Sequence, residues 1–333
     1  MDEITKKFGS LDGLSDIHIR SNKPVSTRIN GEIIVQENSI ISENQINNMI
    51  KKALDKRKLE IFQNQKDVDF AIVSSGNRYR VNIFQSSNGP AIVLRKINES
   101  IPEIGELNLP PVVNDIITEK SGLILVTGAT GSGKSTSIAA MINEINKSRK
   151  ESIITIEDPI EFIHKDEACI VSQREIGRDA NTFHEALRAA LREDPDVILV
   201  GELRDRETIS MALTAAETGH LIFGTLHTNG APNTIHRIID VFPAAQQAQI
   251  RTQLSQSLKM VLSQTLFIKP DHSGRVAAFE VMINNAAIAN LVRENKIEQI
   301  TSVMQTSNQE GMVTLEKSIE VLVGEGQINE GSS

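Results

Sequence analysis

The sequence is poor in residue types on which several classes of protein depend. Among its 333 residues it has one cysteine, Cys169, one tyrosine, Tyr79, and no tryptophan. A single cysteine excludes an internal disulfide framework and a four-cysteine zinc site. The scarcity of aromatic side chains argues against a surface on which the bases of a single-stranded nucleic acid stack. These absences favour a globular protein of a reducing compartment.

Positive charge is also in the minority. The chain has 35 Lys and Arg residues against 43 Asp and Glu residues, a formal net charge of −8. Non-specific nucleic-acid binding needs positive side chains to neutralise phosphates, so we expect no nucleic-acid partner. No apolar run reaches the about 18 residues that cross a bilayer, and residues 1–7 lack the apolar core of a signal peptide. We therefore expect a cytoplasmic protein that reaches a membrane complex only through protein contacts.

Length and patterning predict two domains, at about 100–200 residues each. Residues 17–20 and 25–29 alternate apolar and polar side chains, as half-buried strands do, and Asn30-Gly31 is typical of a two-residue hairpin turn. Residues 43–64 carry apolar side chains at helical spacing. This pattern indicates a small mixed domain over residues 1–98.

Prolines and a glycine then interrupt the chain. Pro102, Gly105, Pro110 and Pro111 fall close together, and proline removes backbone donors and disfavours helix before it. We expect a linker over residues 99–111. Strands and helices alternate after it, which is typical of a parallel sheet with crossover helices and predicts an α/β domain over 112–333.

A phosphate-binding loop motif follows a predicted buried strand. The apolar run at 123–126 leads into a segment that matches G-x-x-x-x-G-K-[ST], with a helical pattern after it. Glycines let backbone N–H groups surround phosphate oxygens, Lys134 bridges the β- and γ-phosphates, and Ser135 ligates Mg²⁺. The motif predicts that ATP and Mg²⁺ are bound by Gly128, Thr130, Gly131, Ser132, Gly133, Lys134, Ser135 and Thr136.

Two later strands end in carboxylates. The run at 153–156 leads to Glu157, and the run at 197–200 leads to Gly201 and Glu202. Ligands of open α/β sheets lie at the carboxyl ends of the strands, so we expect at least one of these glutamates to be catalytic. The residues alone do not rank the two.

Three further side chains have two readings each. His227 ends another strand pattern, where it could sense the γ-phosphate or serve the structure alone. Arg188 and Arg192 lie four residues apart in a helical pattern and share a face. They could reach a phosphate or a neighbouring subunit, or they could form a solvated basic surface.

Four ordered segments resemble motifs of the secretion ATPases, which serve type IV pili and type II secretion. The phosphate loop and residues 155–161, 194–205 and 218–228 look like the family's Walker A motif, Asp box, Walker B motif and His box. Residues 15–19 and 28–31 look like the start of its PAS-like N-terminal domain. The resemblance implies an α/β chain, with a PAS-like α/β domain at 1–98 and a RecA-like P-loop ATPase domain with a C-terminal helical part at 112–333.

Within this family the chain is most similar to the ATPases that retract type IV pili. Residues 237–243, 263–266 and 274–280 resemble theirs, and residues 287–294 resemble their signature A-I-R-N-L-I-R-E. Ala289 departs from that signature, which has an arginine there, and His236 stands where many relatives have Asp. One cysteine cannot build the tetracysteine metal insert of assembly ATPases. The resemblance implies a homohexameric motor that hydrolyses ATP to retract pili and power twitching motility.

The resemblance also implies roles for individual residues and partners. Glu202 coordinates Mg²⁺ or its water shell, Glu157 is the base or orienter of the attacking water, and His227 belongs to the His box. Arg80 and Arg95 match arginines of the N-terminal domain that reach the nucleotide. The implied partners are other copies of the chain, an inner-membrane pilus platform protein and the pilus machinery, with the chain on the cytoplasmic side of that membrane. The linker is then a hinge.

Other functions compete with this one. An ATPase of a plasmid-transfer or other type IV secretion system, or an accessory retraction ATPase, would share all these motifs. A nucleic-acid motor on the same core is disfavoured by the acidic balance and the few aromatic residues. A nucleotide-binding scaffold without catalysis is disfavoured because Lys134, Ser135 and Glu202 are all present.

Overall fold

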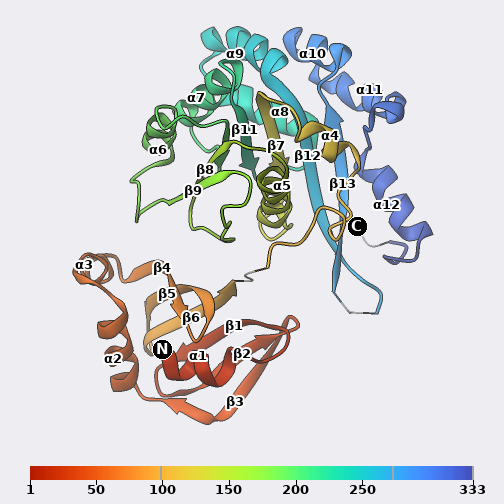
Figure 1. The fold of residues 1–333 in the computed structure, drawn as a ribbon. Helices are drawn as coiled ribbons and strands as arrows, with labels where there is room; N and C mark the ends of the chain where they lie inside the picture. Colours follow the sequence, from red (N-terminus) through yellow and green to blue (C-terminus); the bar gives the residue numbers. More distant parts are fainter. Residues whose placement is uncertain (98–99, 272–273, 332–333) are drawn as a thin grey trace. The chain divides into compact units, whose positions relative to one another are not determined.

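The chain divides into two compact units, Met1–Ser100 and Ile101–Ser333. The computed structural model describes residues 1–97, 100–271 and 274–331 (Figure 1). Asn98, where the predicted first domain ends, Glu99, where the predicted linker begins, and the last two residues lie outside the described residues. No helix of the described ranges combines the length and apolar character that a membrane span requires.

The first unit is a six-stranded antiparallel sheet with helices on one face. The strand order is β3-β2-β1-β6-β5-β4. Its core gathers side chains of α1 and α2 against the inward residues of the central strands, including Ile17, Ile19 and Tyr79. The elements are α1 (Asp2–Phe8), β1 (Leu14–Arg20), β2 (Lys23–Ile29), β3 (Glu32–Ile41), α2 (Glu43–Ala53), α3 (Lys56–Gln65), β4 (Asp67–Ser74), β5 (Asn77–Ser86) and β6 (Gly89–Ile97).

The hairpin turn is confirmed, but the single helix predicted over residues 43–64 is wrong. Asn30 and Gly31 both have positive φ, as the turn between β2 and β3 requires. The helix breaks because Leu54 is extended and Asp55 begins a new one. The Asp55 carboxylate accepts a hydrogen bond from the Lys58 backbone N–H (2.8 Å). An aspartate that caps the following turn in this way competes with continuation of the preceding helix.

The second unit is a seven-stranded sheet covered on both faces. The strand order is β13-β12-β7-β11-β10-β8-β9, with β13 antiparallel to β12 and the other neighbours parallel. Its strands are β7 (Gly122–Thr127), β8 (Ser152–Glu157), β9 (Ile170–Glu175), β10 (Val197–Val200), β11 (Leu221–Leu226), β12 (Leu258–Ile268) and β13 (Arg275–Ile283). Its α-helices are α4 (Val112–Ile116), α5 (Lys134–Ser148), α6 (Phe183–Ala190), α7 (Arg206–Glu217), α8 (Ala231–Asp240), α9 (Ala244–Ser257), α10 (Ala286–Arg293), α11 (Ile300–Thr306) and α12 (Leu315–Gly324).

The central strand β7 shows why both faces are covered. Every residue of β7 is buried. Leu123 and Leu125 point into a core formed with α6 to α11, whereas Ile124 and Val126 point into a second core formed with α4 and α5. A strand with two buried faces needs apolar residues at successive positions, which is the continuous run that the sequence shows.

Residues 101–111 pack onto the second unit where the sequence predicts a linker. Ile104 and Leu109 are buried in the same core as the apolar face of α5. Burial of these two side chains explains why this proline-rich stretch is not a solvated tether. A hinge role for the segment stays a prediction.

Candidate nucleotide-binding and hydrolysis site

The predicted site residues of the second unit gather at one edge of its sheet. Strands β7, β11, β10 and β8 are parallel neighbours, so their carboxyl ends meet at the same edge. The phosphate loop follows β7, His227 follows β11, Glu202 follows β10 by one glycine, and Glu157 ends β8. This edge is where ligands of open α/β sheets bind.

The phosphate loop has a conformation that its glycines permit. Gly128, Gly131 and Gly133 all have positive φ. A Cβ at Gly128 would stand 2.3 Å from the backbone oxygen of Gln264, so no side chain fits there. Among the residues that the structure describes, the Ser132 hydroxyl is buried without a hydrogen-bond partner. A tight loop with an unpartnered buried hydroxyl is suited to enclosing phosphate oxygens.

Lys134 lies inside this loop as the first residue of α5. Its ammonium group donates hydrogen bonds to the backbone oxygens of Gly128 (2.8 Å) and Ala129 (2.9 Å). Burial lowers the pKa of Lys134, and the carboxylates of Glu202 and Glu161 act in the opposite direction. The lysine is thus a mostly buried cation whose ionised form is favoured by the charges of two carboxylates.

Glu202 is the centre of a small polar network. One of its carboxylate oxygens pairs with Arg204 at 2.7 Å and lies 3.4 Å from Nε2 of His227. The other ring nitrogen of His227 lies 3.5 Å from the Thr130 hydroxyl of the phosphate loop. Burial would raise the pKa of Glu202, but Arg204 and His227 outweigh it and the pKa is lowered. His227 therefore links the phosphate loop to an ionised glutamate.

Glu157 has the opposite environment. Burial raises the pKa of its carboxyl group to about 7, although the Thr155 hydroxyl and the Gln173 side-chain amide both donate to it. These donors lie 2.6 Å and 3.2 Å from the same carboxylate oxygen. The two glutamates that the sequence could not rank therefore differ clearly in charge state near neutral pH.

Other predicted residues lie elsewhere. His220 of the His box precedes β11, at the opposite end of that strand from His227, and its ring contacts the Ala215 carbonyl at 3.0 Å. Arg188 lies on the exposed side of α6, and Arg192 is exposed beyond its end.

Arg80 and Arg95 belong to the first unit. They are direct cross-strand partners on β5 and β6. Each is paired with a carboxylate, Arg80 with Asp69 and Arg95 with the buried Asp16 at 2.8 Å. Opposed like charges destabilise a sheet, and the two aspartates offset that repulsion here.

Sequence reasoning missed the side chains that hold the two glutamates. Arg204 follows Glu202 by two residues, but nothing in the sequence signals its ion pair. Thr155 precedes Glu157 by two residues in β8 and so shares its face. Gln173 is 16 residues away in sequence and reaches Glu157 only through the parallel pairing of β8 with β9.

The residues at this edge fit Mg²⁺ bound together with a nucleotide. The described residues contain no cluster of three or more His, Cys, Asp or Glu side chains that could hold a metal alone. Mg²⁺ in phosphate sites is held by one or two protein oxygens together with phosphates and waters. The Ser135 hydroxyl and the ionised Glu202 carboxylate are oxygen donors of this kind.

Comparison with known proteins agrees with this geometry. The family model described as "Type II/IV secretion system protein" matches residues 11–270. A twitching motility protein of Neisseria gonorrhoeae is 49% identical over 86% of this chain and 77% of its own length. The type IV pilus retraction ATPase PilT of Pseudomonas aeruginosa is 46% identical over 97% of this chain and 94% of its own.

A solved structure gives the same result. The crystal structure of the pilus retraction motor PilT with bound ADP has a TM-score of 0.87 and 46% identity, and the match covers 96% of each chain. The mixed α/β fold and the ATPase assignment predicted from the sequence are confirmed. The chain therefore belongs to the type II/IV secretion system protein family, and within it to the pilus-retraction ATPases.

Proposed function

We propose that this chain is a motor that couples ATP hydrolysis to the retraction of type IV pili. The observation that carries the proposal is the convergence of a phosphate loop and two carboxylates at one sheet edge. The chain that holds them is 46% identical to a pilus retraction ATPase over 97% of its length. The position of Ala289 on α10, where the retraction signature has arginine, does not alter any residue of that edge.

The phosphate loop binds the nucleotide in this proposal. Backbone N–H groups of the loop and the first turn of α5 surround phosphate oxygens, and Lys134 exchanges its two loop carbonyls for the β- and γ-phosphates. Ser135 and Glu202 would hold Mg²⁺, which offsets the negative charge of those phosphates when it is bound. The network of Arg204 and His227 keeps Glu202 ionised for this purpose.

The different environments of the two glutamates assign their roles. Enzymes that use two carboxyl groups commonly set their pKa values apart so that each has its own task. Glu157, with a pKa of about 7, is matched to accepting a proton from the attacking water near neutral pH. Glu202, whose pKa is lowered, is matched to metal binding. His227, between Glu202 and Thr130, senses whether the loop is filled.

We extend the proposal to an assembly. Arg80 and Arg95 supply positive charge to the transferred phosphoryl group in a homohexamer, where such groups stabilise developing charge. The segment at 99–111 acts as a hinge between the units. The motor works at the cytoplasmic face of the inner membrane, against a platform protein of the pilus machinery. The support is family membership, because type IV pilus ATPases are among the relatives.

The test is ATP turnover by the purified chain with Mg²⁺. Lys134→Ala removes the cation that holds the phosphates, so both nucleotide binding and turnover should be lost. Glu202→Gln keeps the side-chain shape but removes its charge, so ATP should still bind and phosphate release should slow strongly. An active Lys134→Ala variant would refute the site, and loss of binding by Glu202→Gln would give Glu202 a structural role instead.

A further inference from the structure

Gln173 makes contacts at both ends of its side-chain amide. It lies on β9 opposite Thr155 of β8. Its Nε2 group donates to the Glu157 carboxylate (3.2 Å) and to the Phe162 carbonyl (2.8 Å). Its Oε1 atom accepts a hydrogen bond from the His164 backbone N–H (2.9 Å). One side chain thus joins the glutamate of β8 to the loop at residues 162–164.

These three hydrogen bonds fix the orientation of the amide. A reversed amide would place its oxygen against the Glu157 carboxylate and the Phe162 carbonyl, and its NH₂ group against the His164 N–H. The contacts with Phe162 and His164 would then join acceptor to acceptor and donor to donor, and so would the contact with an ionised Glu157 carboxylate. The donor end of Gln173 must therefore face Glu157, and this orientation favours the ionised carboxylate.

The other groups around Glu157 act on its pKa in opposite directions, so a single hydrogen bond from an amide changes its charge state. The Thr155 hydroxyl donates to the same oxygen (2.6 Å), and the Glu161 backbone N–H also favours the ionised form. Burial and the charge of the Glu161 carboxylate act against it, and the pKa of Glu157 stands at about 7. His164 supplies no positive charge, because burial lowers its pKa to about 4.

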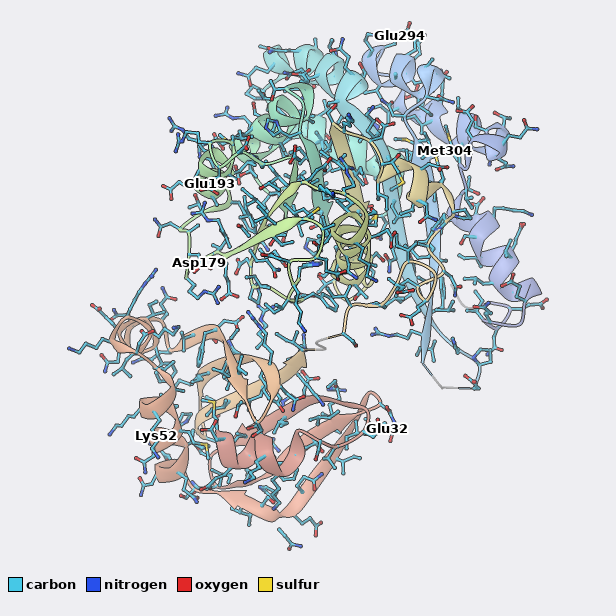
Figure 2. The ribbon with its side chains drawn as sticks, in the orientation of Figure 1. Glu32, Lys52, Asp179, Glu193, Glu294 and Met304 are labelled. Carbon is cyan, nitrogen blue, oxygen red and sulfur yellow. The ribbon has the colours of Figure 1, made fainter. Side chains whose placement is uncertain are left out.

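The backbone of β9 is held independently of Glu157. Arg174, next to Gln173, pairs with Glu193 at 3.1 Å and donates to the Asp179 carbonyl. The Asp179 carboxylate in turn accepts the Glu175 backbone N–H (2.9 Å). Figure 2 labels both partners of Arg174, Asp179 next to β9 and Glu193 by α6. Gln173 therefore projects toward Glu157 from an anchored strand.

We infer that Gln173 is a positioning residue for the reaction: it holds the Glu157 carboxylate in place and ties it to the loop at 162–164. The inference rests on the proposed function, in which Glu157 accepts a proton from the attacking water. Without Gln173 the carboxylate would keep its hydrogen bond from the Thr155 hydroxyl of its own strand, but it would lose its side-chain link to β9 and to the loop. Movement of the loop would be transmitted through the amide to the group that activates water.

The test is the pH profile of kcat for the full-length Gln173→Leu variant, with ATP and Mg²⁺. Loss of a hydrogen bond to a carboxylate raises its pKa by about one unit. The acidic limb of the profile, which reports ionisation of Glu157, should move up by about this amount while KM for ATP stays the same. Activity should be reduced most strongly at pH 7 and should recover only in part at pH 9, where the remaining loss reflects the misplaced carboxylate. A merely structural role would lower the rate without moving the acidic limb.

Two further variants make the result decisive. Ser172→Ala changes the exposed neighbour on the same strand and should keep the wild-type profile. Gln173→Glu keeps the size of the side chain but sets a second carboxylate against Glu157. It should move the acidic limb of the pH profile to still higher pH. This variant tests the inference if Gln173→Leu does not fold. An unchanged acidic limb in a folded, active Gln173 variant overturns the inference, whereas a wild-type chain without ATP turnover overturns the proposed function instead.

Discussion

Replacement of Glu157 by glutamine should stabilise the second unit while it stops hydrolysis. The partly buried carboxyl group of Glu157 has its pKa raised from 4.5 to about 7. Each pKa unit corresponds to about 1.36 kcal/mol, so the ionised group costs the folded state about 3 kcal/mol. A glutamine of the same shape has no charge to desolvate, and its side-chain oxygen can still accept from Thr155 and Gln173.

The sign of the effect depends on pH. Below pH 4.5 the carboxyl group is protonated in both the folded and the unfolded chain, so Glu157 brings no penalty. Between pH 4.5 and about 7 only the unfolded chain loses its proton, and the free energy of unfolding of the wild type falls as the pH rises. Above about pH 7 the penalty is complete. The advantage of Glu157→Gln should therefore be near zero at pH 4 and about 3 kcal/mol at pH 8.

The assay is thermal unfolding of both proteins across this pH range, followed by the transition of the second unit. One kcal/mol shifts Tm by about 2–4 °C in a domain of this size, so we expect a gain of about 6–12 °C at pH 8. Glu167→Gln, which changes an exposed carboxylate in the segment between β8 and β9, is the control and should stay within about 0.5 kcal/mol at every pH. A gain that does not depend on pH, or a loss at pH 8, would show that the charge of Glu157 does not destabilise the folded chain.

Two other predictions concern the same sheet edge. Gly128→Ala should prevent nucleotide binding and should lower Tm by more than Gly219→Ala does. Both positions have positive φ, but only a Cβ at Gly128 meets a backbone atom. Nucleotide titration and thermal unfolding measure the two effects, and equal losses in the two variants would contradict this prediction. Arg204→Ala should change stability by about 1 kcal/mol, since the Arg204 side chain is exposed although its partner Glu202 is mostly buried. It should still slow ATP hydrolysis, most strongly at low pH where Glu202 loses its charge, and an unchanged pH profile would argue against the network.

Local patterns predicted much of the fold and the site. The phosphate loop, the run of buried strands and the carboxyl-end glutamates depend on neighbours in sequence, and parallel pairing brings them to one edge. The break at Asp55 was missed because the apolar spacing on both sides of it fits one helix. The donors to Glu157 were missed because Gln173 meets it only across two paired strands. Charge state, which separates Glu157 from Glu202, depends on burial that no local pattern reports.

The pairing of Arg80 with Asp69 and of Arg95 with Asp16 has a consequence for the proposed assembly. Both arginines must exchange an aspartate for phosphate oxygens before they can stabilise a transferred phosphoryl group. Arg95 must leave the buried carboxylate of Asp16, which would then keep Arg28 at 3.8 Å as its partner. A ligand must therefore compete with these two aspartates for the arginines, which favours a strongly negative ligand.

Pilus retraction by this chain is best tested by a count of surface pili, together with surface motility, in cells whose native chain is replaced by Lys134→Ala. Without ATP turnover pili should still assemble but should not be withdrawn. We therefore expect excess pili and lost motility, with normal numbers and motility restored by the wild-type chain. Cells without pili would contradict a retraction role and would indicate that the chain assembles pili. Unchanged pili and motility would indicate that the chain has no role in pilus function.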